Sequence, residues 1–250
     1  MSEVKNELAR YITDSLKNNY RKTSVLKESN ESSIYIFTHK KRGQKIVERI
    51  SKNRNDDAFR AVRNREIPNL ASIYEVCSTE NSLITIEEFI EGENLSDIIQ
   101  NKTLDMKTAI RYTYQICNAL NGLHEKNVVH RDIKPANIII GNDGSAYLID
   151  LGIARIINHS EDSDTQSLGT AGYAAPEQYG IIQSSQSTDI YALGIVLNKM
   201  ITGVHPSIEM PKGPIKRIVK KSTSLQISKR YKSAKQMQTK LKLLNYFYIF

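Results

Sequence analysis

The chain has 250 residues and a formal net charge of +8, with 40% hydrophobic and 25% charged residues. This length suits one large or two-lobed domain, and the composition excludes a disordered chain. The two distant cysteines, Cys77 and Cys117, exclude a disulfide framework and a paired-cysteine zinc site. No apolar run approaches the roughly 18 residues that span a bilayer, and the charged start MSEVKNELAR is unlike a signal peptide. We therefore expect a cytoplasmic protein without a membrane anchor.

The positive charge is confined to the C-terminal segment. Glu209 is the last acidic residue, and eleven basic residues follow it. The rest of the chain carries 24 basic and 27 acidic residues, a net charge of −3. A charge of +8 alone would suggest a nucleic-acid partner. Because the charge lies on predicted helices, we expect a solvated face or a docking surface for an acidic protein, and no nucleic acid.

The first third of the chain predicts one helix followed by strands. Residues 1 to about 18 form an amphipathic pattern, with Leu8, Tyr11, Ile12 and Leu16 at helical spacing. Short extended runs follow at 24–27, 34–39 and 45–50, and Gly43 marks a turn. A helix is predicted at about 56–65, before two further strands at 71–77 and 82–88.

After Gly92 the pattern becomes helical. Helices are predicted at 106–125, 186–201, 214–221 and 233–244. The chain therefore divides into an N-terminal helix (1–20), a strand-rich lobe (21–89) and a helical lobe (90–250). This is an α+β architecture, and a cleft between lobes is a favoured place for ligands.

Polar residues are concentrated between two apolar runs at 128–140, VVHRDIKPANIII. The pattern HRDxKxxN occupies His130 to Asn137. A predicted strand at 146–149 then leads into Asp150-Leu151-Gly152. Two further segments are GTAGYAAPEQ at 169–178, which contains Ala175-Pro176-Glu177, and DIYALG at 189–194. Loops held by rigid strands are where catalytic groups concentrate.

In this order, these segments resemble the eukaryotic-like protein kinases, particularly their bacterial Ser/Thr branch, over about residues 20–245. The resemblance implies a bilobal kinase fold with a small antiparallel-sheet N-lobe and a helical C-lobe. It also implies ATP and Mg²⁺ as cofactors and transfer of the ATP γ-phosphate to a protein hydroxyl. The implied partners are ATP and an unidentified protein substrate, and the chain is expected to be a monomer or transient dimer.

The resemblance assigns roles in the helical lobe. Asp132 would be the base, Lys134 would lie beside the γ-phosphate, and Asn137 and Asp150 would supply hard oxygen ligands for magnesium. Glu177 would form a structural pair with Arg230. Arg131 would bind a phosphorylated residue of the activation segment, 150–177. The candidates in that segment are Ser163, Thr165, Ser167 and Thr170, although Thr170 is expected to pack near the catalytic Asp.

The nucleotide-binding lobe departs from the family pattern. Lys27, Ser29 and Ser32 occupy the positions of the glycine-rich loop, where side chains should hinder backbone approach to phosphates. Strand alternation places Lys45, Val47 and Arg49 on one face. Val47 then matches the residue over the adenine and Arg49 the strand lysine, with Lys27 and Lys45 as alternatives. Arginine keeps the charge but is bulkier and forked.

The helix partner of Arg49 is predicted to be Asp57, with Glu66 as the alternative and two solvated charges as the plain interpretation. The segment ITIEEFIEG resembles the adenine-contacting hinge, so the backbones of Glu88 and Ile90 should bond the base, and Glu87 would be the gatekeeper. The remaining apolar nucleotide contacts are assigned to Leu26, Ile34 and Ile139. The departures in this lobe leave a second hypothesis open, a pseudokinase or regulatory binding module with little transfer activity.

Overall fold

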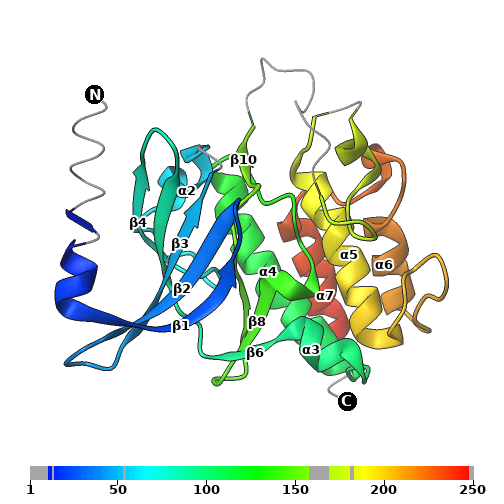
Figure 1. Cartoon of the computed structure of the whole chain (residues 1–250). Coiled ribbons are helices and arrows are strands. Elements are labelled where there is room, and N and C mark those ends of the chain that lie inside the picture. The colour runs from blue at the N-terminus through cyan, green and yellow to red at the C-terminus, as the bar shows by residue number, and fades with distance from the viewer. Residues whose placement is uncertain (1–10, 13, 53–54, 158–168, 181–182, 248–250) are drawn as a thin grey trace. The chain divides into compact units, whose positions relative to one another are not determined.

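The computed structural model describes residues 11–12, 14–52, 55–157, 169–180 and 183–247 (Figure 1). The chain forms two compact units. The first unit holds Met1–Glu66 and Ala71–Ile90, and the second holds Ile67–Leu70 and Glu91–Phe250. Strands dominate the first unit and helices the second, so the α+β class is confirmed.

The first unit is built on one five-stranded antiparallel sheet. Its strands are β1 (Tyr20–Glu28), β2 (Ser32–His39), β3 (Lys45–Ser51), β4 (Ile73–Ser78) and β5 (Leu83–Glu88). Their order is β1-β2-β3-β5-β4, so β3 and β5 are neighbours although β4 separates them in the sequence. This order sets the side chains of β3 against those of β5.

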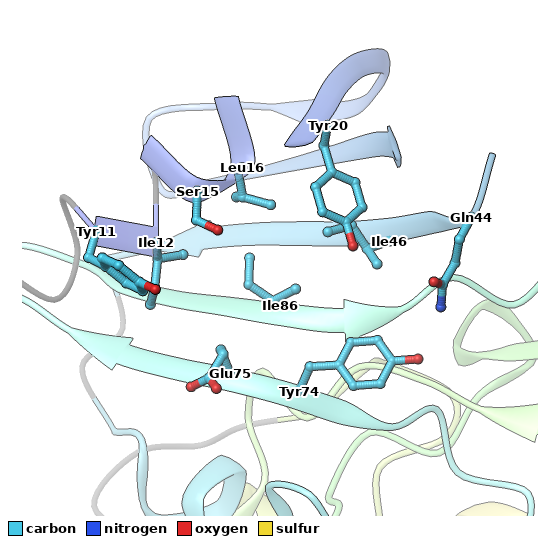
Figure 2. A pocket seen from close by; sticks show the side chains of 10 residues that line it. All are labelled: Tyr11, Ile12, Ser15, Leu16, Tyr20, Gln44, Ile46, Tyr74, Glu75 and Ile86. Carbon is cyan, nitrogen blue, oxygen red and sulfur yellow. The ribbon is translucent and has the colours of Figure 1, made fainter. Parts of the chain in front are cut away.

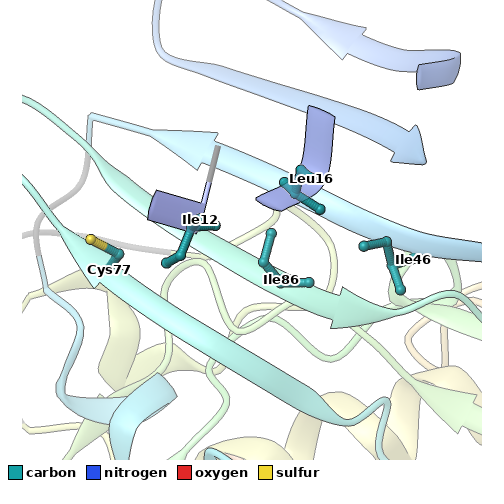
Figure 3. Close-up of a cluster of buried hydrophobic side chains, with 5 residues drawn as sticks. All are labelled: Ile12, Leu16, Ile46, Cys77 and Ile86. Carbon is teal, nitrogen blue, oxygen red and sulfur yellow. The ribbon is translucent and has the colours of Figure 1, made fainter. Parts of the chain in front are cut away.

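The N-terminal helix, described at residues 11–12 and 14–19, packs on one face of this sheet. Ile12 and Leu16 form a buried apolar cluster with Ile46, Cys77 and Ile86 (Figure 3). Because contacts of this kind remove apolar surface from water, the described part of this helix stabilises the first unit. Residues 1–10, including Leu8, lie outside the described residues.

A cavity of about 490 Å³ lies where the N-terminal helix meets the sheet. Its apolar walls come from the helix and from β3 and β5, and the rings of Tyr20 and Tyr74 lie at one end (Figure 2). The helix therefore covers this face without filling it.

Helix α2 (Asp57–Val62) is shorter than the predicted 56–65. It buries Ala58, Phe59 and Val62, and its C-cap, Arg63, already has extended geometry. Asn64 follows with φ 54°, a left-handed conformation that asparagine tolerates. The residues that directly follow Val62 are polar, so a longer helix would bury no further apolar side chain there.

The second unit is mainly helical. Its helices are α3 (Leu95–Gln100), α4 (Met106–Glu125), α5 (Gln186–Thr202), α6 (Ile215–Ser222) and α7 (Ala234–Phe247). Helix α4 has the predicted bounds, and its N-cap is Asp105, whose side chain accepts from the Thr108 amide. Helix α5 is buried along most of its length. The described residues between α5 and α6 contain no further helix, as the short sequence there suggests.

Short strands and 3₁₀ turns of the second unit carry the polar segments. Strands β6 (Gly92–Asn94), β8 (Ile138–Gly141) and β9 (Ala146–Leu148) form one sheet, and β7 (Val128–Val129) pairs with β10 (Arg155–Ile156). The 3₁₀ turns are η1 (Pro135–Asn137), η2 (Pro176–Tyr179) and η3 (Ile227–Lys229). The HRDxKxxN segment therefore connects β7 to β8. Among the helices of the described residues, none is long and apolar enough to cross a bilayer.

Candidate active site

The carboxylate of Asp132 is the centre of a polar cluster in the second unit. Its Oδ1 accepts from the Thr170 hydroxyl at 2.7 Å. Its Oδ2 accepts from Asn137 Nδ2 at 2.9 Å and lies 2.8 Å from Lys134 Nζ. Lys134 Nζ also donates to Thr170 Oγ1 at 2.8 Å. Thr170, a candidate for modification, is thus joined to the predicted base and lysine.

These contacts set the charge state of Asp132. Burial alone would raise the pKa of this carboxyl, but hydrogen bonds from Lys134, Thr170 and Asn137, together with the Lys134 charge, outweigh burial and lower the pKa. Asp132 is therefore ionised at neutral pH. An ionised carboxylate accepts hydrogen bonds only, so it can bind and orient a substrate hydroxyl.

Asp189, in the first turn of α5, holds the backbone of the β7–β8 loop, residues 130–137, which is the predicted catalytic loop. Its Oδ1 accepts from the Arg131 amide at 2.8 Å, and its Oδ2 accepts from the His130 amide at 3.0 Å. The His124 ring also donates to Oδ2, at 2.9 Å. Asp189 is fully buried, so these three donors offset the cost of placing its charge inside the protein.

His130 joins the catalytic loop to the segment before Asp150. The Asp132 amide donates to His130 Nδ1 at 3.3 Å, so Nδ1 is the acceptor and Nε2 carries the hydrogen. Nε2 then donates to the Ile149 carbonyl at 3.2 Å. His130 is fully buried and has a structural role.

Arg131 is buried and has φ 69°, a strained backbone for a side chain of this size. Its carbonyl accepts from Gln178 Nε2 at 2.8 Å, which ties the loop to the end of the activation segment. Of the residues that Arg131 was expected to serve, Ser163, Thr165 and Ser167 lie outside the described residues.

Asn137 and Asp150 lie at the same end of a strand pair. Asn137 directly precedes β8, Asp150 follows β9 closely, and Ile138 pairs with Leu148. The Ile149 amide donates to the Asn137 carbonyl at 3.0 Å. Both hydrogen bonds that the Asn137 side chain makes use Nδ2, which leaves Oδ1 as an oxygen donor. An amide oxygen and a carboxylate on adjacent strand ends fit the ligands that magnesium prefers.

The expected pair of Glu177 and Arg230 is buried in the second unit. Arg230 Nη1 and Nη2 donate to Glu177 Oε1 and Oε2 at 2.6 and 2.9 Å. The Thr188 hydroxyl donates to the same Oε1 at 3.0 Å. This two-point geometry requires arginine, because lysine offers only a single ammonium.

In the first unit, Arg49 is paired across the sheet. Its Nε donates to Glu87 Oε1 at 3.2 Å, and the side chains are 13% and 5% exposed. Lys27 and Lys45, the other candidate cations, are exposed. Asp57, the predicted partner, is exposed at the start of α2, and Glu66 is exposed after that helix. The sequence did not point to Glu87 as a partner.

The residues expected to contact the nucleotide fall in both units. Leu26 in β1 is 60% exposed, whereas Ile34 in β2, Val47 in β3 and Ile90 are half-buried. The Glu88 amide donates to the Ser72 carbonyl at 2.8 Å. Ile139 lies in β8 of the second unit, opposite Tyr147.

The turn between β1 and β2 replaces the glycine-rich loop with a serine-closed hairpin. The Ser29 hydroxyl donates to the Ser32 carbonyl at 2.9 Å and accepts from the Ser32 amide at 3.1 Å. None of residues 27–32 has a positive φ, so this turn does not need glycine.

Comparison with known proteins identifies the family of this chain. The protein kinase domain family matches residues 20–245. This chain belongs to the protein kinase domain family. The kinase domain is 34% identical over 168 residues to a probable serine/threonine-protein kinase of Clostridium perfringens, covering 66% of this chain and 24% of the relative. It is 32% identical over 200 residues to serine/threonine-protein kinase PrkC of Bacillus subtilis, covering 70% and 31%.

A third similar protein is serine/threonine-protein kinase PknB of Mycobacterium tuberculosis, 35% identical over 147 residues, with 56% of this chain and 24% of the relative covered. The kinase domain thus spans about a quarter to a third of the length of these relatives. The predicted resemblance to bacterial Ser/Thr kinases is confirmed.

Sequence reasoning missed three residues that organise this kinase domain: Asp189, Gln178 and Glu87. Asp189 and Gln178 lie in segments that carried the resemblance, DIYALG and GTAGYAAPEQ, but their hydrogen-bond partners are distant in the sequence. Glu87 could have been found as the partner of Arg49 only from the register in which β3 pairs with β5.

Proposed function

We propose that this chain is an active Ser/Thr protein kinase that transfers the ATP γ-phosphate to a hydroxyl group of a protein. The observation that carries the proposal is the cluster of Asp132, Lys134, Asn137 and Thr170. It joins an ionised carboxylate to a lysine and an amide within direct hydrogen-bond distance. Phosphoryl transfer depends mainly on alignment and on neutralising charge, and little on covalent chemistry by the protein.

Asp132 orients the substrate hydroxyl and accepts its proton. The low pKa of Asp132 makes it a weak base, which suits a transition state in which the leaving group departs early and the hydroxyl needs orientation most. Lys134, held at 2.8 Å from Asp132, places a positive charge beside the carboxylate, where a transferring phosphoryl group would develop negative charge.

Asn137 Oδ1 and the Asp150 carboxylate are the residues that would hold magnesium. Bound there, the ion supplies charge neutralisation for the phosphates of ATP. Asp150 has φ 69°, and its Oδ1 accepts from the Gly152 amide at 2.9 Å, so the local backbone fixes the direction of this carboxylate.

A regulatory binding module with little transfer activity is the second candidate. The β1–β2 hairpin favours it, because Ser29 and Ser32 place side chains where backbone amides would approach phosphates. The two functions differ in one measurable property, since only the kinase transfers phosphate in a manner that depends on Asp132.

The test compares the parent chain with Asp132→Asn and with Asp143→Asn, an exposed aspartate in the β8–β9 turn. Each is incubated with γ-labelled ATP, magnesium and a library of Ser- and Thr-containing peptides. The proposal expects label on peptide or protein with the parent and Asp143→Asn, and at least about a hundredfold less with Asp132→Asn. The proposal would be wrong if all three proteins gave equal, near-zero labelling and ATP did not raise the melting temperature of the parent. That result would argue against both catalysis and nucleotide binding. ATP binding without transfer would support the regulatory module.

A further inference from the structure

Arg49 and Glu87 form a largely buried ion pair within the sheet of the first unit. Arg49 pairs with Thr85 in the register of β3 and β5, and Val47 pairs with Glu87. Arg49 and Glu87 are therefore diagonal neighbours on one face of the sheet. Their 3.2 Å contact is set by the backbone register.

Thr85 fixes the carboxylate from its own strand. Its hydroxyl donates to Glu87 Oε1 at 2.5 Å, the same oxygen that accepts from Arg49 Nε. Thr85 is 1% exposed and Glu87 is 4% exposed. Glu87 thus has little freedom to rotate, and Arg49 is held against a rigid partner.

Stability does not explain this pair well. Removing two charges from water costs several kcal/mol per ion, so apolar residues at such positions are often equally or more stabilising. A buried, oriented charge is useful where it must meet another charge in one geometry. In protein kinases, the strand cation contacts the α- and β-phosphates of ATP, and a glutamate on the following helix holds it.

The helix does not carry a buried carboxylate in this chain. Among the described residues of α2, Asp57 is the acidic one, and it is exposed. Asp56, the N-cap of α2, accepts a hydrogen bond from Arg60 Nε at 2.7 Å and another from the Ser78 hydroxyl. Glu66 is exposed beyond the helix. These carboxylates are solvated or committed to other partners.

We propose that Glu87 is the positioning residue for Arg49 and takes the role that a helix glutamate has in other kinases. The inference rests on the proposed function, because it assigns Arg49 to the phosphates of ATP. It has a regulatory consequence. Helix position controls the ion pair in kinases that use a helix glutamate, whereas the pair of Arg49 and Glu87 forms within one sheet. Its formation is therefore independent of where α2 lies.

The test measures kcat and KM for ATP in Glu87→Gln, Glu87→Asp, Asp57→Asn and Arg49→Ala, and in the double variant of Arg49→Ala with Glu87→Gln. Glu48→Gln is the matched control, because Glu48 is a buried glutamate on β3 whose side chain lies on the opposite face from Arg49. We expect Glu87→Gln to lower kcat/KM at least about tenfold and Glu87→Asp to recover most of it. Glu48→Gln should stay within about twofold of the parent.

The double variant separates positioning from general structural support. If Glu87 acts through Arg49, Glu87→Gln causes no further loss of kcat/KM once Arg49 is alanine, whereas independent effects would multiply. Melting temperatures of all variants are recorded, and if Glu87→Gln fails to fold, the same cycle is built with Glu87→Met, which also removes the carboxylate.

Three results would overturn the inference. They are Glu87→Gln within twofold of the parent, multiplying effects in the double variant, or a larger loss from Asp57→Asn than from Glu87→Gln. A parent chain that neither binds ATP by calorimetry nor transfers phosphate would instead overturn the proposed function. An active parent with an unaffected Glu87→Gln leaves the proposed function standing and rejects only the role of Glu87.

Discussion

Arg230 and Glu177 form a two-point ion pair inside the second unit, with side-chain exposures of 0% and 1%. The arginine lies 53 residues after the glutamate in the sequence. Two further N–H groups of Arg230 are also used, since Nε donates to the Ser224 carbonyl at 2.7 Å and Nη1 to the Ser187 carbonyl at 3.1 Å. One cation of the basic C-terminal segment is thus a core residue, and it ties η2 to the loop before α7.

Replacing Arg230 by alanine should therefore cost about 3–5 kcal/mol of unfolding free energy, because Glu177 stays buried with its charge uncompensated. Urea denaturation measures this loss. Lys229→Ala, an exposed neighbour, should change the free energy by less than about 0.5 kcal/mol. The combination of Arg230→Met with Glu177→Gln should be more stable than Arg230→Met alone. A double variant less stable than the single one would show that the charge of Glu177 is satisfied by other groups.

Asp189 should protect the amides of the catalytic loop from hydrogen exchange. In Asp189→Asn, one acceptor oxygen is replaced by an NH₂ group that faces N–H donors, so we expect faster exchange at His130 and Arg131. We also expect a loss of about 3 kcal/mol in stability, since buried charged hydrogen bonds are lost. Asp105→Asn is the control, because asparagine also caps a helix. Unchanged exchange at both amides would mean that Asp189 does not hold the loop.

Glu48 should make the stability of the first unit depend on pH. Burial raises the pKa of this carboxyl above its ordinary value of 4.5, although the charge of Lys22 opposes the shift. Below pH 4.5 the folded and unfolded chains are both protonated at this position. As the pH rises, the unfolded chain ionises first, so the contribution to stability is lost between the ordinary pKa and the raised one.

Glu48→Gln should consequently raise the melting temperature at pH 7, because glutamine has no charge to bury. The difference from the parent should shrink towards zero below pH 4.5. Thermal melts of both proteins between pH 4 and 8 measure it, with the exposed Glu31→Gln as a control. A difference that grows towards acid pH would contradict the sign of the shift.

The N-terminal helix should stabilise the first unit through Leu16. This side chain is 6% exposed and packs in the cluster with Ile46 and Ile86. Truncation to alanine should cost about 2–5 kcal/mol. Lys17→Ala removes an exposed side chain of the same helix and should have little effect. Hydrogen exchange in β3 and β5 should increase for Leu16→Ala, and equal exchange in both variants would show that the helix is dispensable.

Periodic patterns with a clear end signal could be predicted from the sequence. Helix α4 has the predicted bounds because its apolar stripe is regular and Asp105 caps its start. Helix α3 was missed, since its six residues bury only Leu95 and show no stripe. Strand β1 extends beyond the predicted 24–27, because an edge strand is defined by its pairing with β2 more than by its exposed side chains.

The residues of the polar cluster could be predicted from the sequence, but the hydrogen bonds between them could not. The spacing HRDxKxxN identified Asp132, Lys134 and Asn137, and the family resemblance alone placed Thr170, 38 residues away, near Asp132. Arg49 and Glu87 have the same separation, but no resemblance pointed to that pair. A partner of this kind depends on strand register and tertiary folding, which local patterns do not encode.

The first turn of α5 serves three parts of the second unit at once. The Ser187 carbonyl receives Arg230, the Thr188 hydroxyl bonds Glu177, and Asp189 holds the catalytic loop. The loop that carries Asp132, the 3₁₀ turn η2 and Arg230 therefore share one anchor of three consecutive residues. A shift of that turn along the helix axis would displace all of them in the same direction. Substitutions there cannot separate folding from chemistry, so this turn is unsuitable for making an inactive variant that is otherwise intact.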